Sequence, residues 1–266
     1  MPITSVQLYS LRDAIADDLD AAIARVREIG YENVEPYAFV ERAADLERAF
    51  AATGLKAPSG HVAVIDAADT APIWDAAERL GIRTVIDPFI PTDRWQTADD
   101  VKAIADRVNE LTAEAAARGL QFGYHNHQWE FTNKVEGRTV YELFVEQLAP
   151  ETVLEVDTFW ATVGGADAPA VLRSLGDRVV AIHVKDGQVD GDIRDALPSS
   201  ESALIVPEAL QRAFENQTPA GQGDVDVVSI LAAAPQAIRV VEFDAYKGDV
   251  FEGIAESLTW LGDNDK

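Results

Sequence analysis

The chain has four histidines, and two of them stand two residues apart in the segment YHNHQWEF, residues 124–131. Side chains two residues apart on a β-strand point to the same face, so we expect His125 and His127 to lie side by side. Burying two polar groups on one strand face is unfavourable unless they bind something. This pair therefore marks a candidate site.

Polar residues end the other β-rich runs as well. In addition to the pair above, they comprise Glu35, His61, Asp87, Asp157, His183, Lys185, Glu242 and Asp244. Carboxylates from several strands, together with an imidazole, form an oxygen-rich donor set that suits Mn²⁺, Mg²⁺ or Co²⁺, with Zn²⁺ as an alternative. Ligands spread over several strands also leave positions open for substrate oxygens.

Simpler structural roles compete for some of these residues. His61 fits a buried core histidine as well as a binding residue, and Asp87 fits a carboxylate that shapes a loop. Lys185 and Asp244 fit a structural ion pair. These alternatives stay open at the level of sequence.

Three further residues lie next to the polar strand ends. Glu155 points the same way as Asp157 but one layer deeper, and we expect it to be a structural partner. Trp129 and Trp160 either pack beneath loops or form an apolar wall against a sugar ring.

Eight β-rich runs alternate with amphipathic helical patterns. We expect strands at 4–9, 33–37, 56–62, 84–88, 121–127, 152–157, 179–185 and 238–243. We expect helices at 18–29, 41–53, 70–80, 97–118, 140–148, 167–175, 225–233 and 250–261. Several helices end in a glycine that serves as a left-handed cap, as in ERLGIRTVI.

Eight such units predict a single (β/α)8 TIM barrel domain over residues 1–266. A doubly wound open sheet is the main alternative, but LYSLRDA is not the glycine-rich loop which that fold would need after its first strand. The long connection 187–224 follows the seventh strand and is predicted to act as a lid over the barrel mouth. No run of basic residues marks a phosphate site, although Arg194 in this insertion is a candidate.

Composition excludes several classes of function. The 46 acidic and 22 basic residues give a net charge of −24, which argues against nucleic-acid binding because phosphate neutralisation needs clustered Lys and Arg. The absence of cysteine excludes thiolate nucleophiles and cysteine zinc sites. No apolar run is long enough to cross a bilayer, and MPITSVQLYS lacks a signal-peptide pattern. We therefore expect a cytoplasmic protein without nucleic-acid or membrane partners.

Six motifs occur in order along nearly the whole chain, namely VQLYSLRD, YHNHQWEF, LEVDTFWATVGGAD, RVVAIHVKD, AGQGDVD and VVEFDAY. In this combination the chain resembles the xylose isomerase-like TIM barrel superfamily. Within it the chain is similar to the sugar phosphate isomerase/epimerase branch, with its inosose dehydratase and 3-keto-sugar enzyme relatives. The resemblance implies one divalent metal ion, with Mn²⁺ expected first.

The resemblance also implies a ligand set. The family binds its metal with Glu, Asp, His and Glu, and the last three match Asp157, His183 and Glu242. The first glutamate of many relatives falls on His125 here, so Glu130 is expected to replace it. His125 or His127 on the metal is the alternative.

Family epimerases use two metal-bound glutamates as bases, and a histidine in place of one suggests histidine acid–base chemistry. The expected catalytic residues are His127, His125, Lys185 and Glu242. The expected substrate contacts are Glu35, His61, Trp129, Trp160 and Lys185.

The resemblance implies a metal-dependent isomerase or epimerase of a small carbohydrate. It would remove a proton next to the carbonyl of a ketose, keto-inositol or 3-keto-sugar and form an enediolate held by the metal. A dehydratase or lyase on a keto-inositol or 3-keto-glycoside is the main alternative. An endonuclease IV-like repair enzyme and a non-catalytic sugar-binding barrel are more remote. Barrels of this family often pair, so a homodimer is compatible with the resemblance.

Overall fold

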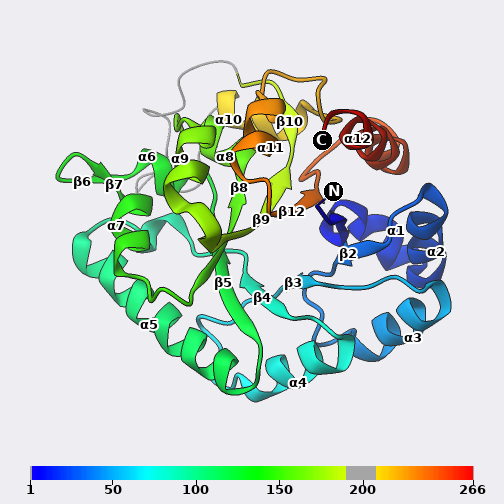
Figure 1. The fold of residues 1–266 in the computed structure, drawn as a ribbon, viewed down its shortest axis with the longest axis horizontal. Helices are drawn as coiled ribbons and strands as arrows, with labels where there is room; N and C mark the ends of the chain where they lie inside the picture. The colour runs from blue at the N-terminus through cyan, green and yellow to red at the C-terminus, as the bar shows by residue number, and fades with distance from the viewer. Residues whose placement is uncertain (1, 190–207, 266) are drawn as a thin grey trace.

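Eight parallel strands form the centre of the molecule. The computed structural model describes residues 2–189 and 208–265. The strand order is β2-β1-β12-β9-β8-β5-β4-β3. Isolated parallel bridges join Asn33 to Lys56 and Tyr37 to His61, between the β2 and β3 segments, so the sheet is nearly closed. The predicted TIM barrel is confirmed (Figure 1).

All eight predicted strands are present, and most end earlier than predicted. They are β1 (Thr4–Gln7), β2 (Asn33–Glu35), β3 (Ser59–His61), β4 (Thr84–Asp87), β5 (Gln121–His125), β8 (Val153–Asp157), β9 (Val179–Val184) and β12 (Ile238–Val241). His127, Lys185 and Glu242 therefore lie just beyond their strands, at the mouth of the barrel.

Helices surround the barrel, and α2 to α5 form much of the outer ring in Figure 1. They are α1 (Arg12–Asp17), α2 (Leu19–Ile29), α3 (Ala43–Thr53), α4 (Ala71–Leu80), α5 (Ala98–Ala117), α6 (Trp129–Thr132), α7 (Val140–Gln147), α8 (Thr158–Val163), α9 (Ala168–Leu175), α10 (Glu208–Glu215), α11 (Val227–Ala233) and α12 (Val250–Asn264). Three 3-10 helices are η1 (Leu8–Leu11), η2 (Thr92–Arg94) and η3 (Gly176–Arg178).

Local sequence signals explain where the helices begin and end. Thr97 and Asp100 form a capping box that starts α5. Gly81 adopts φ 72° after α4, a left-handed conformation that glycine accepts without strain and that turns the chain toward β4. None of the helices in the described ranges is long and apolar enough to cross a membrane.

The predicted lid is described only in part. Residues 190–207, with Arg194, lie outside the described residues. On either side, β10 (Asp186–Gly187) pairs antiparallel with β11 (Gln217–Thr218), and α10 precedes β11. A second small hairpin, β6 (Lys134–Val135) with β7 (Arg138–Thr139), follows α6. The lid stays a prediction.

Candidate metal centre

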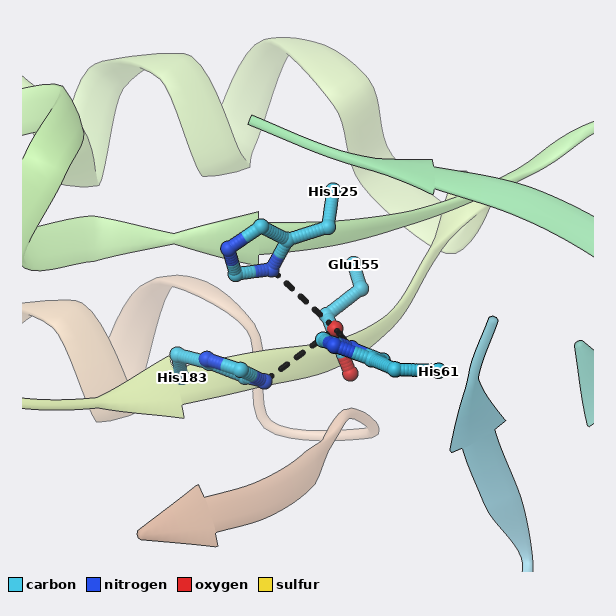
Figure 2. Close-up of side chains that lie close together, drawn as sticks. All are labelled: His61, His125, Glu155 and His183. Carbon is cyan, nitrogen blue, oxygen red and sulfur yellow. Dashed lines mark hydrogen bonds and ion pairs between the residues drawn. The ribbon is translucent and has the colours of Figure 1, made fainter. Parts of the chain in front are cut away.

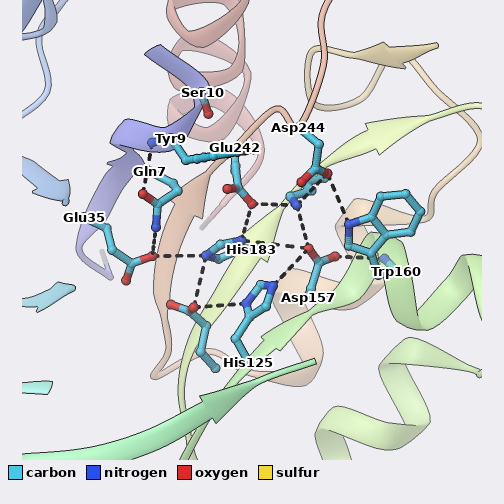
Figure 3. A network of polar contacts seen from close by, with 12 residues as sticks. Gln7, Tyr9, Ser10, Glu35, His125, Asp157, Trp160, His183, Glu242 and Asp244 are labelled. Carbon is cyan, nitrogen blue, oxygen red and sulfur yellow. Dashed lines mark hydrogen bonds and ion pairs between the residues drawn. The ribbon is translucent and has the colours of Figure 1, made fainter. Parts of the chain in front are cut away.

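Three potential metal ligands lie together at the C-terminal end of the barrel. Asp157 is the last residue of β8, His183 belongs to β9, and Glu242 directly follows β12. One potential ligand atom of each lies within 4.8 Å of the others. His183 Nδ1 is 2.6 Å from Glu242 Oε2 and 3.9 Å from Asp157 Oδ2. The structure therefore brings together the three residues that sequence reasoning assigned to the metal (Figure 3).

The two oxygens of Asp157 have different surroundings. Oδ1 accepts a hydrogen bond of 2.8 Å from Trp160 N, which caps α8 directly after β8. Oδ2 is buried and accepts no hydrogen bond from the described residues, although Lys185 Nζ lies 2.8 Å away. Since a buried carboxylate oxygen needs a hydrogen bond or a cation, Oδ2 fits a metal ligand.

Lys185 is a buried cation beside these donor atoms. Its Nζ lies 2.6 Å from Glu242 Oε2 and 2.8 Å from Asp244 Oδ2. Burial opposes its charge, but Asp157, Asp244 and Glu242 raise the pKa of Lys185 well above its usual value. The ion pair of Lys185 with Asp244 that the sequence allowed is present.

Glu155 is the centre of a second group, one layer deeper in the barrel (Figure 2). Its Oε2 lies 2.5 Å from His61 Nε2, 3.1 Å from His125 Nδ1 and 3.1 Å from His183 Nε2. Its Oε1 is buried and has no hydrogen-bond partner among the described residues. The four side chains also have the spacing of metal ligands.

His125 and His183 connect the two layers. His125 turns Nδ1 to Glu155 and Nε2 toward Asp157 Oδ2, at 3.7 Å. His183 turns Nε2 to Glu155 and Nδ1 to Glu242. A carboxylate on one ring nitrogen orients a histidine and fixes its tautomer, which leaves the other nitrogen free to bind a metal. Glu155 therefore has the supporting geometry that the sequence suggested.

The protonation of the imidazoles follows their neighbours. Burial opposes charge on His61, but Glu35 and Glu155 raise its pKa to about 10. Burial also opposes charge on His183, but Glu155 and a second carboxylate raise its pKa well above the usual value. Burial, followed by the charge on His183, holds the pKa of His125 well below its usual range. His125 is therefore the neutral imidazole of the three.

Glu35 is buried and does not belong to the lining of the cavity, and its role as a substrate contact stays a prediction. Its Oε1 is 3.1 Å from His61 Nε2 and 3.1 Å from His183 Nε2, and it accepts a hydrogen bond of 2.8 Å from Gln7 Nε2. Ser59 Oγ donates a short hydrogen bond to its other oxygen. Glu35 therefore supports the histidines from below.

Glu130 is not where the expected ligand set requires it. Its Oε1 accepts a hydrogen bond of 2.6 Å from Tyr124 Oη, and its Oε2 accepts one of 2.9 Å from His127 N. Tyr124 precedes His125 on β5 and so points to the opposite face of the strand. Burial raises the pKa of Glu130 to about 8. His125 stands beside Asp157 instead, as in the alternative ligand set.

His127 and Trp129 form one side of the barrel mouth. Their rings are stacked, with centroids 4.4 Å apart and an interplanar angle of 2°, and Phe89 meets both edge-on. No hydrogen bond reaches the His127 ring from the described residues, and Nδ1 is buried without a partner. Burial, followed by the charge of Lys185, lowers the pKa of His127 below its usual range.

A cavity of about 540 Å³ opens above these residues. It is lined by Tyr9, Tyr37, Ala38, His61, Val62, Ala63, Pro88, Phe89, His125, His127, Trp129, Phe214, Glu242 and Asp244. The predicted contacts His61 and Trp129 therefore face the cavity. Trp160 does not line it, because its ring is buried and donates Nε1 to Asp244 Oδ2 at 3.1 Å. Lys185 lies beneath the lining as well.

Sequence reasoning named Trp129 but missed Tyr9, Tyr37 and Phe89 in the lining, although a signal exists. Tyr9, Tyr37 and Phe89 each stand two residues after a polar residue at a strand end, and Trp129 has the same offset from His127. Asp87 is the loop-shaping residue that the sequence favoured, because its carboxylate accepts hydrogen bonds from three backbone N–H groups, including that of Phe89.

The donor chemistry fits a divalent cation. Asp157 Oδ2 and Glu242 Oε2 offer two carboxylate oxygens, and His183 Nδ1 offers a nitrogen, with His125 Nε2 next to them. Such a mixed oxygen and nitrogen set suits Mn²⁺, Co²⁺ or Zn²⁺ and is compatible with Mg²⁺. The arrangement can therefore hold a metal at the edge of a cavity that is open to substrate.

Solved structures share this fold at low sequence identity. A sugar phosphate isomerase/epimerase from Parabacteroides distasonis ATCC 8503 is 19% identical with a TM-score of 0.77, over 98% of this chain and 93% of that chain. The IOLI protein with a bound zinc atom is 15% identical with a TM-score of 0.68, over 100% and 98%. A 3-keto-D-glucoside 4-epimerase from E. coli is 14% identical with a TM-score of 0.65, over 98% of each chain.

A search of curated proteins finds no match to this sequence. The family model described as "Xylose isomerase-like TIM barrel" matches residues 23–263, which include every barrel strand except β1. By this match, the chain belongs to the xylose isomerase-like TIM barrel family.

Proposed function

We propose that this chain is a divalent-metal-dependent carbohydrate isomerase or epimerase. It removes a proton from the carbon next to the carbonyl of a ketose, keto-inositol or 3-keto-sugar. The observation that carries the proposal is the group Asp157, His183 and Glu242, in which the buried Asp157 Oδ2 accepts no hydrogen bond from the described residues and faces the cation of Lys185. Glu242 of this group lines the cavity. The isomerases and epimerases among the structural neighbours support the same reaction class.

Four residues would hold the metal. Asp157, His183 and Glu242 supply three ligands, and the position of His125 supports it, rather than Glu130, as the fourth. Mn²⁺ is our first choice, and the zinc atom of the IOLI protein supports a divalent cation in general. When bound, such a cation would polarise the substrate's carbonyl and so acidify the adjacent C–H bond.

His127 is the proposed general base. Its ring lines the cavity, and burial lowers its pKa to about 3, so it is neutral at pH 7 and would act as a weak base. Lys185 stays protonated between three carboxylates and therefore cannot take that role. His125 is the next candidate, since its pKa is also lowered, although metal binding would occupy its outer nitrogen.

A dehydratase or lyase is the second candidate function. Removal of the same proton can be followed by departure of an oxygen substituent from the next carbon, with the proton taken up by His127 passed to the departing oxygen. The cavity volume of about 540 Å³ favours this alternative, because it leaves room for a leaving group beside the sugar ring.

Hydrogen–deuterium exchange tests the proposal. A ketose, a keto-inositol and a 3-keto-glucoside are incubated with the Mn²⁺-loaded protein in deuterated water, and deuterium at each carbon is measured by NMR. We expect exchange at one carbon next to the carbonyl. Asp157→Asn should lose both metal and exchange. His127→Gln should keep the metal and lose about 10²–10⁴ in exchange rate.

Asp93→Asn, at an exposed carboxylate in η2, serves as the control and should behave like the wild type. Full metal content in Asp157→Asn would contradict the ligand assignment. Loss of metal in His127→Gln would make His127 a ligand rather than the base. Product that has lost a substituent, instead of an isomer, would assign the lyase reaction.

A further inference from the structure

We infer that the natural substrate is a sugar that carries an aromatic ring, such as an aryl glycoside in its keto form. The inference rests on the proposed function, because it names the substrate class of the same cavity. It is argued from the aromatic residues, volume and charge of that cavity.

Two pairs of aromatic side chains stand on separate sides of the cavity. Tyr9 and Tyr37, after β1 and β2, form a tyrosine wall, with ring centroids 5.4 Å apart and planes at 89°. Phe89 and Trp129, after β4 and β5, form a phenylalanine–tryptophan wall, with centroids 5.4 Å apart and planes at 83°. In the barrel, β3 separates the walls on one side, and β12, β9 and β8 separate them on the other.

One ring of each wall is exposed to solvent. Phe89 is 53% exposed and Tyr9 is 40% exposed, and both line the cavity. Exposed apolar side chains that gather in one groove often mark a ligand-binding surface. Asp87 fixes the position of Phe89 through the Phe89 N–H, so the ring is presented by an ordered loop. Flat rings prefer stacked or edge-on contact with another aromatic ring.

The volume of the cavity leaves room beyond a single sugar. About 540 Å³ lies within the range of roughly 300–1,000 Å³ that is typical of pockets for drug-sized ligands. The metal donors stand at the polar end of the cavity, where Glu242 belongs to its lining. A sugar ring at that end leaves the space between the aromatic walls for a second ring.

The charge of the cavity disfavours a phosphate. Among the described residues, its lining contains Glu242 and Asp244 but neither lysine nor arginine. Arg12 and Arg42 are near the rim, where each contacts a tyrosine of the tyrosine wall, and neither lines the cavity. Phosphate binding in proteins relies on Arg, Lys or a helix N-terminus facing the ligand, and two carboxylates would repel a dianion.

Calorimetric titration with stable probes tests the inference. Phenyl β-D-glucoside, methyl β-D-glucoside and glucose 6-phosphate are titrated into the Mn²⁺-loaded protein. We expect phenyl β-D-glucoside to bind about tenfold or more tightly than methyl β-D-glucoside, and glucose 6-phosphate to bind weakest. Phe89→Leu and Tyr9→Leu should weaken the binding of phenyl β-D-glucoside more than that of methyl β-D-glucoside and so lose this preference, and Phe89→Trp should retain it.

Val228→Ala is the matched control, because Val228 is 53% exposed, as Phe89 is, but lies on α11 outside the cavity. Equal binding of the two glucosides would overturn the inference, as would glucose 6-phosphate binding most tightly. Binding does not require turnover, so the two proposals can fail separately. If the protein prefers phenyl β-D-glucoside but catalyses no deuterium exchange, only the proposed reaction is refuted. If it catalyses exchange but shows no such preference, only the inference of an aromatic substrate is refuted.

Discussion

One carboxylate, Glu155, organises the imidazoles of the site. Its Oε2 faces His61, His125 and His183, and the last two turn their other nitrogens toward the upper donor atoms. A hydrogen bond to one ring nitrogen of a histidine leaves the lone pair on the other nitrogen. Glu155 therefore orients His125 and His183 so that each can bind a metal through its other nitrogen. The sequence placed Glu155 one layer below Asp157, and strand alternation alone was sufficient for that.

Glu130 shows what spacing in the sequence leaves open. The resemblance supplied a glutamate close in sequence to the expected ligand position, but spacing could not show which way a loop residue points. Tyr124 Oη and His127 N take both carboxylate oxygens. Glu130 is therefore a buried hydrogen-bond acceptor that fixes the loop carrying His127.

Glu130→Gln tests this structural role. Burial raises the pKa of Glu130 from 4.5 to about 8, so the folded state holds the proton more tightly than the unfolded state. The resulting stabilisation is present below about pH 4.5 and is lost as the pH rises toward 8. In this window, the free energy of unfolding of the wild type should fall by up to about 1.4 kcal/mol per pH unit relative to that of Glu130→Gln. Urea unfolding at several pH values measures both.

The exposed Glu28 provides the matched control, and Glu28→Gln should show no such divergence from the wild type. Glu130→Gln should also keep its full metal content. If the metal were lost while the fold remained, Glu130 would be a ligand and the structural assignment would be wrong.

At the scale of elements, Asp186 connects the end of β9 to the segment before α11. Its Oδ1 accepts hydrogen bonds from Gly187 N and Val225 N, and its Oδ2 accepts them from Gly221 N and Gly223 N, at 2.8 to 3.0 Å. One buried carboxylate thereby holds the AGQGDVD turn against the barrel. The turn follows β11, which carries Gln217, a hydrogen-bond partner of Asp244.

Asp186→Ala should loosen this turn without unfolding the barrel. It removes four hydrogen bonds to a charged acceptor, each worth about 1.5–3 kcal/mol, so we expect local destabilisation of about 3 kcal/mol or more. Hydrogen exchange should accelerate at Gly221, Gly223 and Val225 and stay slow in β8. Asp263→Ala, which removes an exposed carboxylate on α12, is the control. Unchanged protection in Asp186→Ala would refute the role.

The elements themselves were largely predictable. All eight strands and the eight long helical segments follow from hydrophobic patterns and glycine caps. Strand ends were placed too late, because the apolar pattern continues where the barrel pairing stops. After β1, for example, Leu8–Leu11 is already a 3-10 helix. The short α1, α6 and α8 were missed because one or two turns contain too few residues to show a period.

The candidate site was predictable only where the strands position it. Asp157, His183 and Glu242 meet because the C-terminal ends of barrel strands converge. Tyr9, Tyr37 and the other aromatic residues of the lining lie in the connections that follow the strands. The direction of a side chain there depends on the local backbone angles, so it cannot be predicted from the two-residue alternation of a strand. Their shared two-residue offset from a polar strand end is visible in the sequence, but it becomes meaningful only with the cavity known.

At the scale of the whole molecule, the two ends of the barrel carry different groups. The C-terminal end holds carboxylates and imidazoles, which lower stability unless they bind cations. Near the N-terminal end, the buried Arg239 pairs with Asp265 at 2.9 Å and donates to the backbone oxygens of Leu231, Ala234 and Ala237. Arg239 thereby links β12 to the residue after α12, at the end of the barrel opposite the candidate metal centre.

Net charge is the other property of the whole chain. With 46 acidic and 22 basic residues, 24 acidic charges would remain even if every cation were paired. Surface pairs such as Arg79–Glu47 and Arg118–Glu78 are exposed and contribute little. Repulsion among the remaining carboxylates opposes the compact state, and salt screens it over a Debye length of about 10 Å at 0.1 M.

Thermal stability should therefore rise with salt. Between 20 mM and 0.5 M NaCl at pH 7.5, we expect Tm to increase, with about 2–4 °C for each kcal/mol of repulsion removed. Differential scanning calorimetry measures this. At pH 5, closer to the isoelectric point of about 4.3, fewer carboxylates are ionised and the increase should be smaller. A Tm that falls with salt at pH 7.5 would mean that the surface ion pairs outweigh the repulsion.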